Sequence, residues 1–305
     1  MGHGEWPAVP VAAWEETRDT LHMWTQIVGK VRLALEPWVN HSWHTTLYVS
    51  ARGLTTSLMP YRSGGLEIEF DFVDHVLDLR TTSGARRHVA LEPRSVADFH
   101  AETMARLGEL DVVVEMLPRP VEVPVAVPFA EDKEHASYDG EAARRFWLSL
   151  VQARRVFGEF RSGFVGKVSP VHFFWGAFDL AVTRFSGRGA PRHPGGVPNC
   201  ADWVQEDAYS HEVSSCGYWP GGNEEGTFYS YAYPEPAGFR DWPVEGAVYD
   251  ETLGEFVLPY EVVRMAQDPD ATLMSFLQAT YEAAAENARW DRAALESGPL
   301  TRGNA

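Results

Sequence analysis

The sequence predicts an α+β fold in which helices pack against antiparallel sheet. Segments at both ends of the chain and in its middle carry apolar residues at three- and four-residue steps, the spacing of a helix with one buried face. The segments between them are short, alternate polar with apolar residues or are rich in aromatic and β-branched residues, and are separated by turn residues. Strands that follow one another so closely pair antiparallel, because parallel strands need a long crossover.

The first half of the chain, residues 14–116, predicts a helix, a run of strands and a second helix. Residues 1–13 are Pro-rich and predict an extended lead-in. The first helix begins at Trp14 and ends before Pro37, which cannot continue it. The predicted strands are 47–50, 66–72, 76–81, 87–91 and 111–116, with a helix from Pro93 to about Leu107 between the last two.

The second half, residues 139–290, repeats that order after a Pro-rich connection at 117–138. Four prolines exclude a helix from the connection: Pro118, Pro120, Pro124 and Pro128. Asp139 is the expected N-cap of a helix whose apolar stripe runs from Phe146 to Phe160. The predicted strands are 171–176, 178–185, 208–214, 226–233 and 255–259, followed by a helix at about 269–288. Residues 296–305 are expected to form a disordered tail.

We expect residues 14–295 to form a single α+β unit. Val28-Gly29-Lys30-Val31 closes the first helix and Val165-Gly166-Lys167-Val168 follows the second. Each is followed by His and Trp residues, a strand and an arginine, Arg52 or Arg184. The spacings match poorly, so two interpretations stay open. Either two similar helix-plus-sheet halves surround a shared cleft, or the chain is one α+β domain without an internal repeat.

Charge and cysteine content narrow the class of protein. The formal net charge of -17 excludes a basic face for nucleic acid and opposes adsorption to anionic membranes. Glu67, Glu69 and Asp71 alternate in the strand at 66–72, which is typical of the solvated face of a sheet. Only two cysteines are present, and no apolar run is long enough to span a bilayer. We therefore expect a cytoplasmic protein whose partner is a small molecule, with the oligomeric state undetermined.

The stretch at 165–188 is the predicted floor of a binding pocket. Apolar and aromatic residues dominate it, so it is expected to be buried, yet it contains Lys167, His172, Asp179 and Arg184. Buried polar groups without partners cost a few kcal/mol each, so such a segment holds either a structural polar network or a site. The loops at 40–46, 186–200 and 209–223 are the predicted rim.

Histidines make a metal site one hypothesis. His41 and His44 are three residues apart and would converge on one ion in a helical turn. Together with His172 and His211 they could ligate a divalent transition metal, since imidazole is its commonest ligand in proteins. The alternative is that they are ordinary core and surface histidines. The familiar nucleotide-binding, hydrolase and zinc-protease motifs are absent.

For catalysis the candidates are His172, His211 and Glu212, as a base or a metal ligand. His211 and Glu212 are adjacent on a predicted strand, so only one of them can face a pocket. Arg184 is the predicted anion clamp, because a guanidinium at the end of an apolar strand needs an acidic partner or a ligand. The other expected substrate-binding residues are the walls Trp175 and Tyr138 and the cations Lys167 and Arg52. Cys216 as a nucleophile is less favoured than a buried cysteine.

Several longer motifs carry a resemblance. They are Asn40-His41-Ser42-Trp43-His44, Ala51-Arg52-Gly53-Leu54-Thr55-Thr56, His135-Ala136-Ser137-Tyr138-Asp139, Ser169-Pro170-Val171-His172-Phe173-Phe174-Trp175-Gly176, Tyr209-Ser210-His211-Glu212-Val213 and Tyr231-Ala232-Tyr233-Pro234-Glu235-Pro236. In these motifs the chain resembles an uncharacterised bacterial family, a domain of unknown function, over about residues 6–295. The resemblance implies one full-length unit and implies no activity, cofactor or catalytic residue.

The sequence therefore predicts an enzyme that acts on a small anionic or aromatic metabolite in a His-, Arg- and Trp-lined pocket, with or without a metal. The alternative is a non-catalytic small-molecule-binding protein that uses the same pocket. A third interpretation is a structural protein whose histidines only satisfy a polar core.

Overall fold

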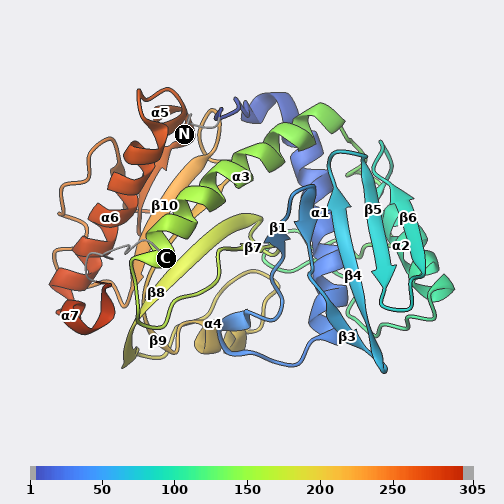
Figure 1. Ribbon diagram of the computed structural model, residues 1–305, viewed down its shortest axis with the longest axis horizontal. Helices are drawn as coiled ribbons and strands as arrows, with labels where there is room; N and C mark the ends of the chain where they lie inside the picture. The colour runs from blue at the N-terminus through green and yellow to red at the C-terminus, as the bar shows by residue number, and fades with distance from the viewer. Residues whose placement is uncertain (1–4, 298–305) are drawn as a thin grey trace, which may run out of the picture.

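Two antiparallel sheets of six strands each, with helices packed on them, make up the structure (Figure 1). It is a computed structural model that describes residues 5–297. The predicted α+β class is therefore confirmed. No helix within the described residues is long and apolar enough to cross a membrane.

The first sheet lies between α1 (Val11–Leu35) and α2 (Val96–Glu109) in sequence and packs on both. Its strands are β1 (Tyr48–Val49), β2 (Gly53–Thr55), β3 (Met59–Tyr61), β4 (Gly64–Asp71), β5 (Val76–Thr81) and β6 (Arg86–Ala90). They pair in the order β1-β2-β4-β5-β6, with β3 on β4. Trp24 of α1 stacks on Phe99 of α2 at a centroid distance of 4.4 Å, and Phe99 contacts Phe70 of β4. This aromatic stack is the centre of the first core.

The second sheet is a simple meander. Its strands are β7 (His172–Phe174), β8 (Asp179–Gly189), β9 (His211–Trp219), β10 (Thr227–Tyr233), β11 (Val248–Asp250) and β12 (Glu255–Pro259), in the order β11-β12-β10-β9-β8-β7. One face packs on α3 (Gly140–Ser162) and α6 (Pro269–Asn287). The predicted N-cap of α3 is confirmed, since Asp139 Oδ1 accepts from the backbone N–H of Glu141 and Ala142.

The two sheets meet at one edge of each. Leu47 and Phe173 exchange backbone hydrogen bonds of 2.9 and 2.7 Å, which joins the region of β1 to β7. The helix α3 contacts strands of both sheets and also α1, so it connects the two halves (Figure 1). Each half begins with a long helix and contributes six strands, and a helix, α2 or α6, follows those strands. An origin by duplication stays a prediction.

Side chains of β8 alternate between two environments, and this alternation positions the site. Leu180, Val182 and Arg184 point toward α3 and α6, while Asp179 and Phe185 point to the opposite face. On β9 the residues opposite them continue the same two faces. We call the face with Asp179 and Phe185 the outer face of the second sheet.

The prediction that the acidic side chains of β4 form a solvated face is wrong. Glu69 and Asp71 are only 6% and 4% exposed, so they do not form a solvated face. Arg80 Nη2 lies 2.7 Å from Glu69 Oε2, and Arg52 pairs with Asp71. Arginines on neighbouring strands and loops thus neutralise the buried carboxylates of the first sheet, which a strand pattern alone does not reveal.

Several elements differ from the prediction. Residues 111–116 form no strand, and the structure adds η1 (Asn40–Ser42), α4 (Asp202–Ala208), α5 (Tyr260–Arg264) and α7 (Arg292–Leu295) as well as the strands β2, β3 and β11. The predicted tail begins too early, because Tyr281 donates a hydrogen bond to Glu296. The rest of that tail, residues 298–305, and residues 1–4 of the predicted lead-in lie outside the described residues.

Candidate functional site

Three of the predicted site residues meet at the outer face of the second sheet: His41, Lys167 and His211. Lys167 lies opposite Phe185 of β8, whose backbone N–H donates to the Lys167 carbonyl at 3.0 Å. His41 comes from η1, and its ring lies 4.6 Å from the ring of Phe185 and 5.8 Å from that of His211. We call His41, Trp43, Lys167, Phe185 and His211 the His41–Lys167 site.

The backbone of η1 holds His41 in an uncommon conformation. His41 and Ser42 have φ angles of 61° and 58°, in the left-handed region that non-glycine residues rarely occupy. The backbone N–H of His41 donates to Asp207 Oδ2 at 2.9 Å, and its Nδ1 lies 3.0 Å from the carbonyl oxygen of Ala208. Helix α4 therefore orients the imidazole ring from both the main chain and the side chain.

The second ring nitrogen of His41 faces Lys167. A carbonyl can only accept a hydrogen bond, so Nδ1 of His41 carries the hydrogen and Nε2 has a free lone pair. Lys167 Nζ lies 2.8 Å from this Nε2 and about 5 Å above the rings of Trp43 (5.2 Å) and Phe185 (5.1 Å). The ammonium of Lys167 thus donates its proton toward a neutral imidazole, inside a partial aromatic cage.

Burial shifts both groups of this pair in the same direction. It lowers the pKa of His41, and the positive charge of Lys167 adds to that effect, while the contact with the Ala208 carbonyl opposes it. Burial likewise lowers the pKa of Lys167, against the attraction of Asp207. Because two neighbouring cations repel each other, the pair holds one proton between two basic nitrogens. The hydrogen bond between Lys167 Nζ and His41 Nε2 is the path along which that proton can move.

His211 lies beside the pair at the start of β9. It is half-buried, and its Nδ1 lies 3.0 Å from the hydroxyl of Ser210. Its neighbour Glu212 points to the opposite face of the sheet, so the prediction that only one of the two can face a shared site holds. His211 is therefore available to a molecule bound next to His41.

Farther along the outer face lies a group of acids and tyrosines without arginine partners. Tyr229 donates to Asp179, and the hydroxyls of Tyr209 and Tyr231 lie 2.8 Å apart. Burial raises the pKa of Asp179 to about 7, and it raises that of Glu255 to about 7 with the repulsion of Asp179 adding to it. Among the described residues no Lys, Arg or His forms an ion pair with either carboxyl group. These carboxyl groups are poised to hold protons near neutral pH.

His172 lies on the same face but is completely enclosed. It is 0% exposed, and neither ring nitrogen has a hydrogen-bond partner among the described residues. The rings of Phe174 (4.6 Å), Trp43 (6.4 Å) and Tyr48 (6.5 Å) surround it. Burial lowers its pKa to about 3, with a smaller contribution from the charge of Arg32. In this state His172 has no access to a substrate, which corrects its prediction as a catalytic base.

Arg184 is buried as predicted, at 2% exposure, and its role as an anion clamp stays a prediction. Its guanidinium lies 3.5 Å from the ring centroid of Phe160 and 4.3 Å from that of Tyr281, and it donates to the Phe160 carbonyl. Burial lowers its pKa to about 10. Because it points toward α3 and α6, Arg184 lies on the opposite side of the sheet from the His41–Lys167 site.

The remaining predicted substrate-binding residues have structural partners away from this site. Trp175 is 5% exposed and donates through Nε1 to the Thr45 carbonyl at 2.6 Å. The hydroxyl of Tyr138 lies 2.8 Å from Nδ1 of His75 in the first core. Arg52 pairs with Asp71 and, at 2.6 Å, with Asp74.

The four histidines predicted as metal ligands do not converge. His44 is buried with its Nδ1 3.1 Å from the Val39 carbonyl, and the ring of His172 lies 4.6 Å from that of Phe174. Only His41 and His211 lie near each other. Among residues 5–297 no group of three or more His, Cys, Asp or Glu side chains is arranged to hold a metal ion. The geometry therefore does not support the metal hypothesis.

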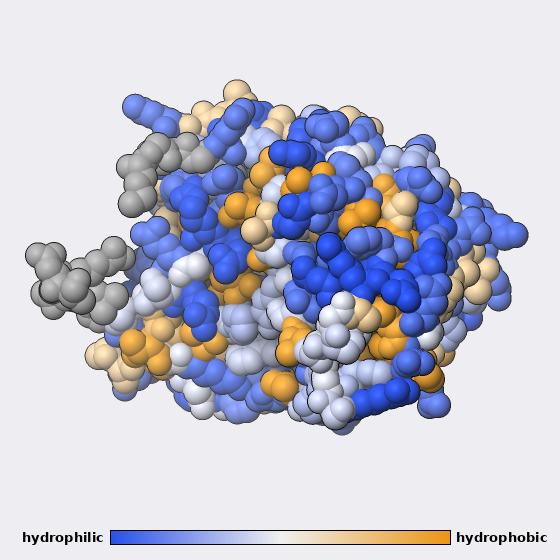
Figure 2. Space-filling view, turned by 45° about the vertical axis from the view of Figure 1, so that its right-hand side comes forward, coloured by the Kyte–Doolittle hydropathy of each residue, from blue (hydrophilic) through white to orange (hydrophobic). Residues whose placement is uncertain are grey.

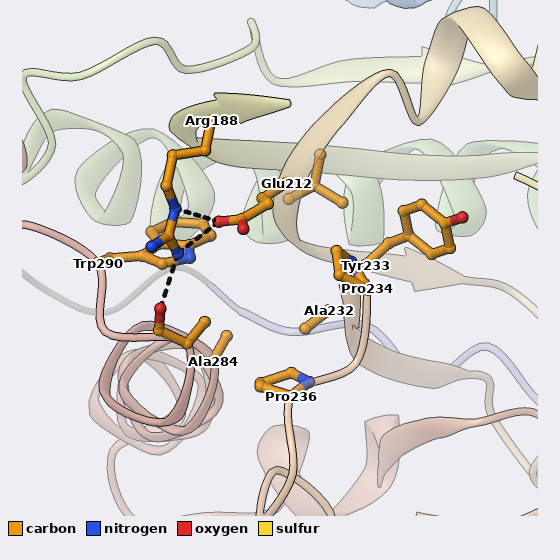
Figure 3. Close-up of a pocket in the computed structure, with 10 residues that line it drawn as sticks. Arg188, Glu212, Ala232, Tyr233, Pro234, Pro236, Ala284 and Trp290 are labelled. Carbon is orange, nitrogen blue, oxygen red and sulfur yellow. Dashed lines mark hydrogen bonds and ion pairs between the residues drawn. The ribbon is translucent and has the colours of Figure 1, made fainter. Parts of the chain in front are cut away.

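Glu212 lines a cavity of about 160 Å³ on the helix side of the sheet (Figure 3). Its Oε2 accepts from Arg188 Nη2 at 2.6 Å, and Arg188 also donates to the Ala288 carbonyl. The rest of the wall is mainly apolar and includes Ala284 and Trp290. Figure 3 shows the Tyr233 ring pointing away from the Arg188–Glu212 pair. Since the Nε and Nη2 groups of Arg188 already donate to Glu212 and Ala288, this cavity offers few free donors for recognising a ligand.

Sequence reasoning missed the residues that position the site, chiefly Asp207 and Ala208 of α4. This helix is short and has no buried residue, so it lacks the apolar periodicity that predicts helices. Trp43 and Phe185 lie in the predicted rim and the predicted floor of the pocket, but neither residue by itself indicates a binding role. The tyrosines at alternating positions 229, 231 and 233 were detectable as one strand face.

The chain belongs to a family of unknown function (DUF5996), whose model matches residues 6–297. No curated protein and no solved structure matches it.

Proposed function

We propose that the protein, a member of a family of unknown function, is an enzyme that acts on a small anionic or aromatic metabolite at the His41–Lys167 site. The observation that carries the proposal is the 2.8 Å contact between Lys167 Nζ and His41 Nε2. A lysine ammonium that donates to a neutral imidazole has a direct path for passing its proton to that ring.

The surroundings support a substrate of this class. Lys167 and His211 offer donors to a carboxylate or carbonyl oxygen, and the rings of Trp43 and Phe185 offer an apolar wall. The face shown in Figure 2 is mainly hydrophilic, with apolar residues in small separate patches.

In the proposed mechanism His41 and Lys167 act as one acid–base pair. Lys167 passes its proton to Nε2 of His41 and becomes a neutral amine that can take a proton from the substrate or attack it. The Ala208 carbonyl stabilises the imidazolium that forms, because it already accepts from Nδ1. His211 would hold the oxygen on which negative charge develops.

A metabolite screen with three variants tests the proposal. Wild-type protein, Lys167→Ala and His41→Asn are incubated with a library of small carboxylates and aromatic metabolites, and both ligand stabilisation and product formation are followed. Asparagine is chosen because it tolerates the positive φ of position 41. Lys133→Ala is the control, since Lys133 is exposed and lies outside the site.

We expect a ligand that stabilises wild-type and Lys133→Ala protein and is converted by both. Both site variants should lose at least tenfold in turnover. A ligand that binds at the site and is recovered unchanged would favour the non-catalytic binding protein instead. Ligand conversion that is unaffected by both site variants would refute the proposal.

A further inference from the structure

The chain contains only three lysines, and their environments differ sharply: Lys30, Lys133 and Lys167. Lys30 is 4% exposed and lies inside the protein, 5.9 Å from the ring of Trp175. Lys133 is exposed in the connection before α3 and forms no ion pair among the described residues. Lys167 alone is both accessible and hydrogen-bonded to a ring nitrogen that can take its proton.

We propose that Lys167 is a covalent site that forms an imine with the carbonyl carbon of an aldehyde or ketone substrate. The inference rests on the proposed function in one respect, namely that the substrate occupies the His41–Lys167 site. It adds the class of substrate and the bond that forms. The aromatic rings of Trp43 and Phe185 beside Nζ favour a carbonyl compound with a planar or apolar substituent.

The chemistry balances with the groups present. Lys167 first gives one proton to Nε2 of His41, and the neutral amine attacks the carbonyl carbon, so that a C–N bond forms and the C=O π pair moves to oxygen. A proton then moves from nitrogen to that oxygen, which gives a carbinolamine. His41 returns its proton to the hydroxyl group, which leaves as water while the nitrogen lone pair forms the C=N bond. The net reaction consumes no oxidant or reductant.

The surroundings of Lys167 also favour the nucleophilic form. Burial disfavours the ammonium and lowers the pKa of Lys167, against the attraction of Asp207. Each unit by which an amine pKa falls raises the neutral fraction at neutral pH about tenfold. Lys133 has no comparable neighbour, so it is an internal reference for an ordinary exposed amine.

Reductive trapping tests the inference directly. The folded protein is treated at pH 7 with benzaldehyde and sodium cyanoborohydride, and the benzylated peptides are quantified by mass spectrometry over time. Lys167 and Lys133 react in the same sample, so reagent concentration and protein stability do not affect the ratio of their labelling rates. We expect Lys167 to react at least tenfold faster than Lys133, and Lys30 to stay unmodified.

Two variants identify the cause of the reactivity. In His41→Asn protein the rate at Lys167 should fall to within about twofold of the unchanged rate at Lys133. Lys167→Arg keeps the charge but cannot form an imine, so Lys133 should be the only lysine that is labelled. Equal rates at Lys167 and Lys133 in wild-type protein would overturn the inference, even if the metabolite screen finds a bound ligand. Fast labelling of Lys167 would uphold it even if that screen finds none, and only the proposed function would then be in question.

Discussion

Replacing His172 by phenylalanine should make the protein less sensitive to acid. The ring of His172 is completely buried without a hydrogen-bond partner, and its pKa is lowered from 6.5 to about 3, chiefly by burial. The folded protein therefore keeps this histidine neutral at pH 5, whereas the unfolded chain binds a proton below pH 6.5. A group that binds more protons in the unfolded state makes stability fall as the pH falls.

The size of the effect follows from the two pKa values. The ordinary histidine pKa of 6.5 lies 1.5 pH units above pH 5, and one unit corresponds to about 1.4 kcal/mol. Protonation of His172 in the unfolded chain therefore lowers the unfolding free energy at pH 5 by about 2 kcal/mol relative to neutral pH. Any folded pKa below 4 gives the same result at pH 5. Other groups titrate in this range too, including His22, whose pKa burial lowers to about 4. The prediction therefore concerns the difference between variant and wild type.

The assay is urea unfolding of both proteins at pH 7.5 and pH 5. The difference in unfolding free energy between His172→Phe and wild type should change by about 2 kcal/mol in favour of the variant at pH 5. Phe173→Leu is the control, because it alters packing at the adjacent buried position without a titratable group. Its effect should be equal at both pH values. A change below about 0.5 kcal/mol for His172→Phe would show that the ring is solvated or paired in solution.

Two further variants test the charges on the two faces of the second sheet. Arg184→Lys should lower the melting temperature by a few degrees and leave ligand binding at the His41–Lys167 site unchanged, because the guanidinium contacts Phe160 and Tyr281 on the helix side. Weaker binding with an unchanged melting temperature would instead support its role as an anion clamp. Asp179→Asn should be more stable than wild type at pH 8 in urea unfolding, because burial raises the pKa of Asp179 to about 7. In the wild-type protein this carboxyl group gains a proton as the pH falls through 7, and the folded state becomes more stable. The difference in unfolding free energy between Asp179→Asn and wild type should therefore shrink by roughly 2 to 3 kcal/mol by pH 5. A difference that does not change with pH would contradict the assigned burial.

Local patterns predicted most of the fold because they depend on neighbours in sequence. The N-cap Asp139 and the alternation in β4 each describe one element, and both were right about that element. Residues 111–116 have the composition of a strand, but no strand lies beside them to pair with. Alternation likewise distinguishes the two faces of β4 without showing that Arg80 of β5 neutralises Glu69.

The candidate site was harder to predict because its contacts join distant segments. The spacing of His41 and His44 suggested one shared metal, but the positive φ of His41 and its bonds to α4 turn the ring toward Lys167 instead. For Arg184 the sequence correctly indicated burial and the need for a partner. It could not show that aromatic rings rather than an anion would satisfy the charge, because Tyr281 lies almost one hundred residues away.

The two sheets differ in how their buried carboxyl groups are paired, and this difference supports a functional role for the second sheet. In the first sheet, buried Asp71 and Asp78 are paired with Arg52 and Arg86, so the protein itself satisfies them. In the second sheet, the buried carboxyl group of Asp179 accepts from the hydroxyl of Tyr229 and forms no ion pair among the described residues. A buried carboxyl group without a cation destabilises the folded state at neutral pH, and such costs gather where a ligand or a proton transfer uses them. Because Asp179 shares its sheet face with Phe185 of the His41–Lys167 site, this cost supports the proposal that the outer face of the second sheet carries the function.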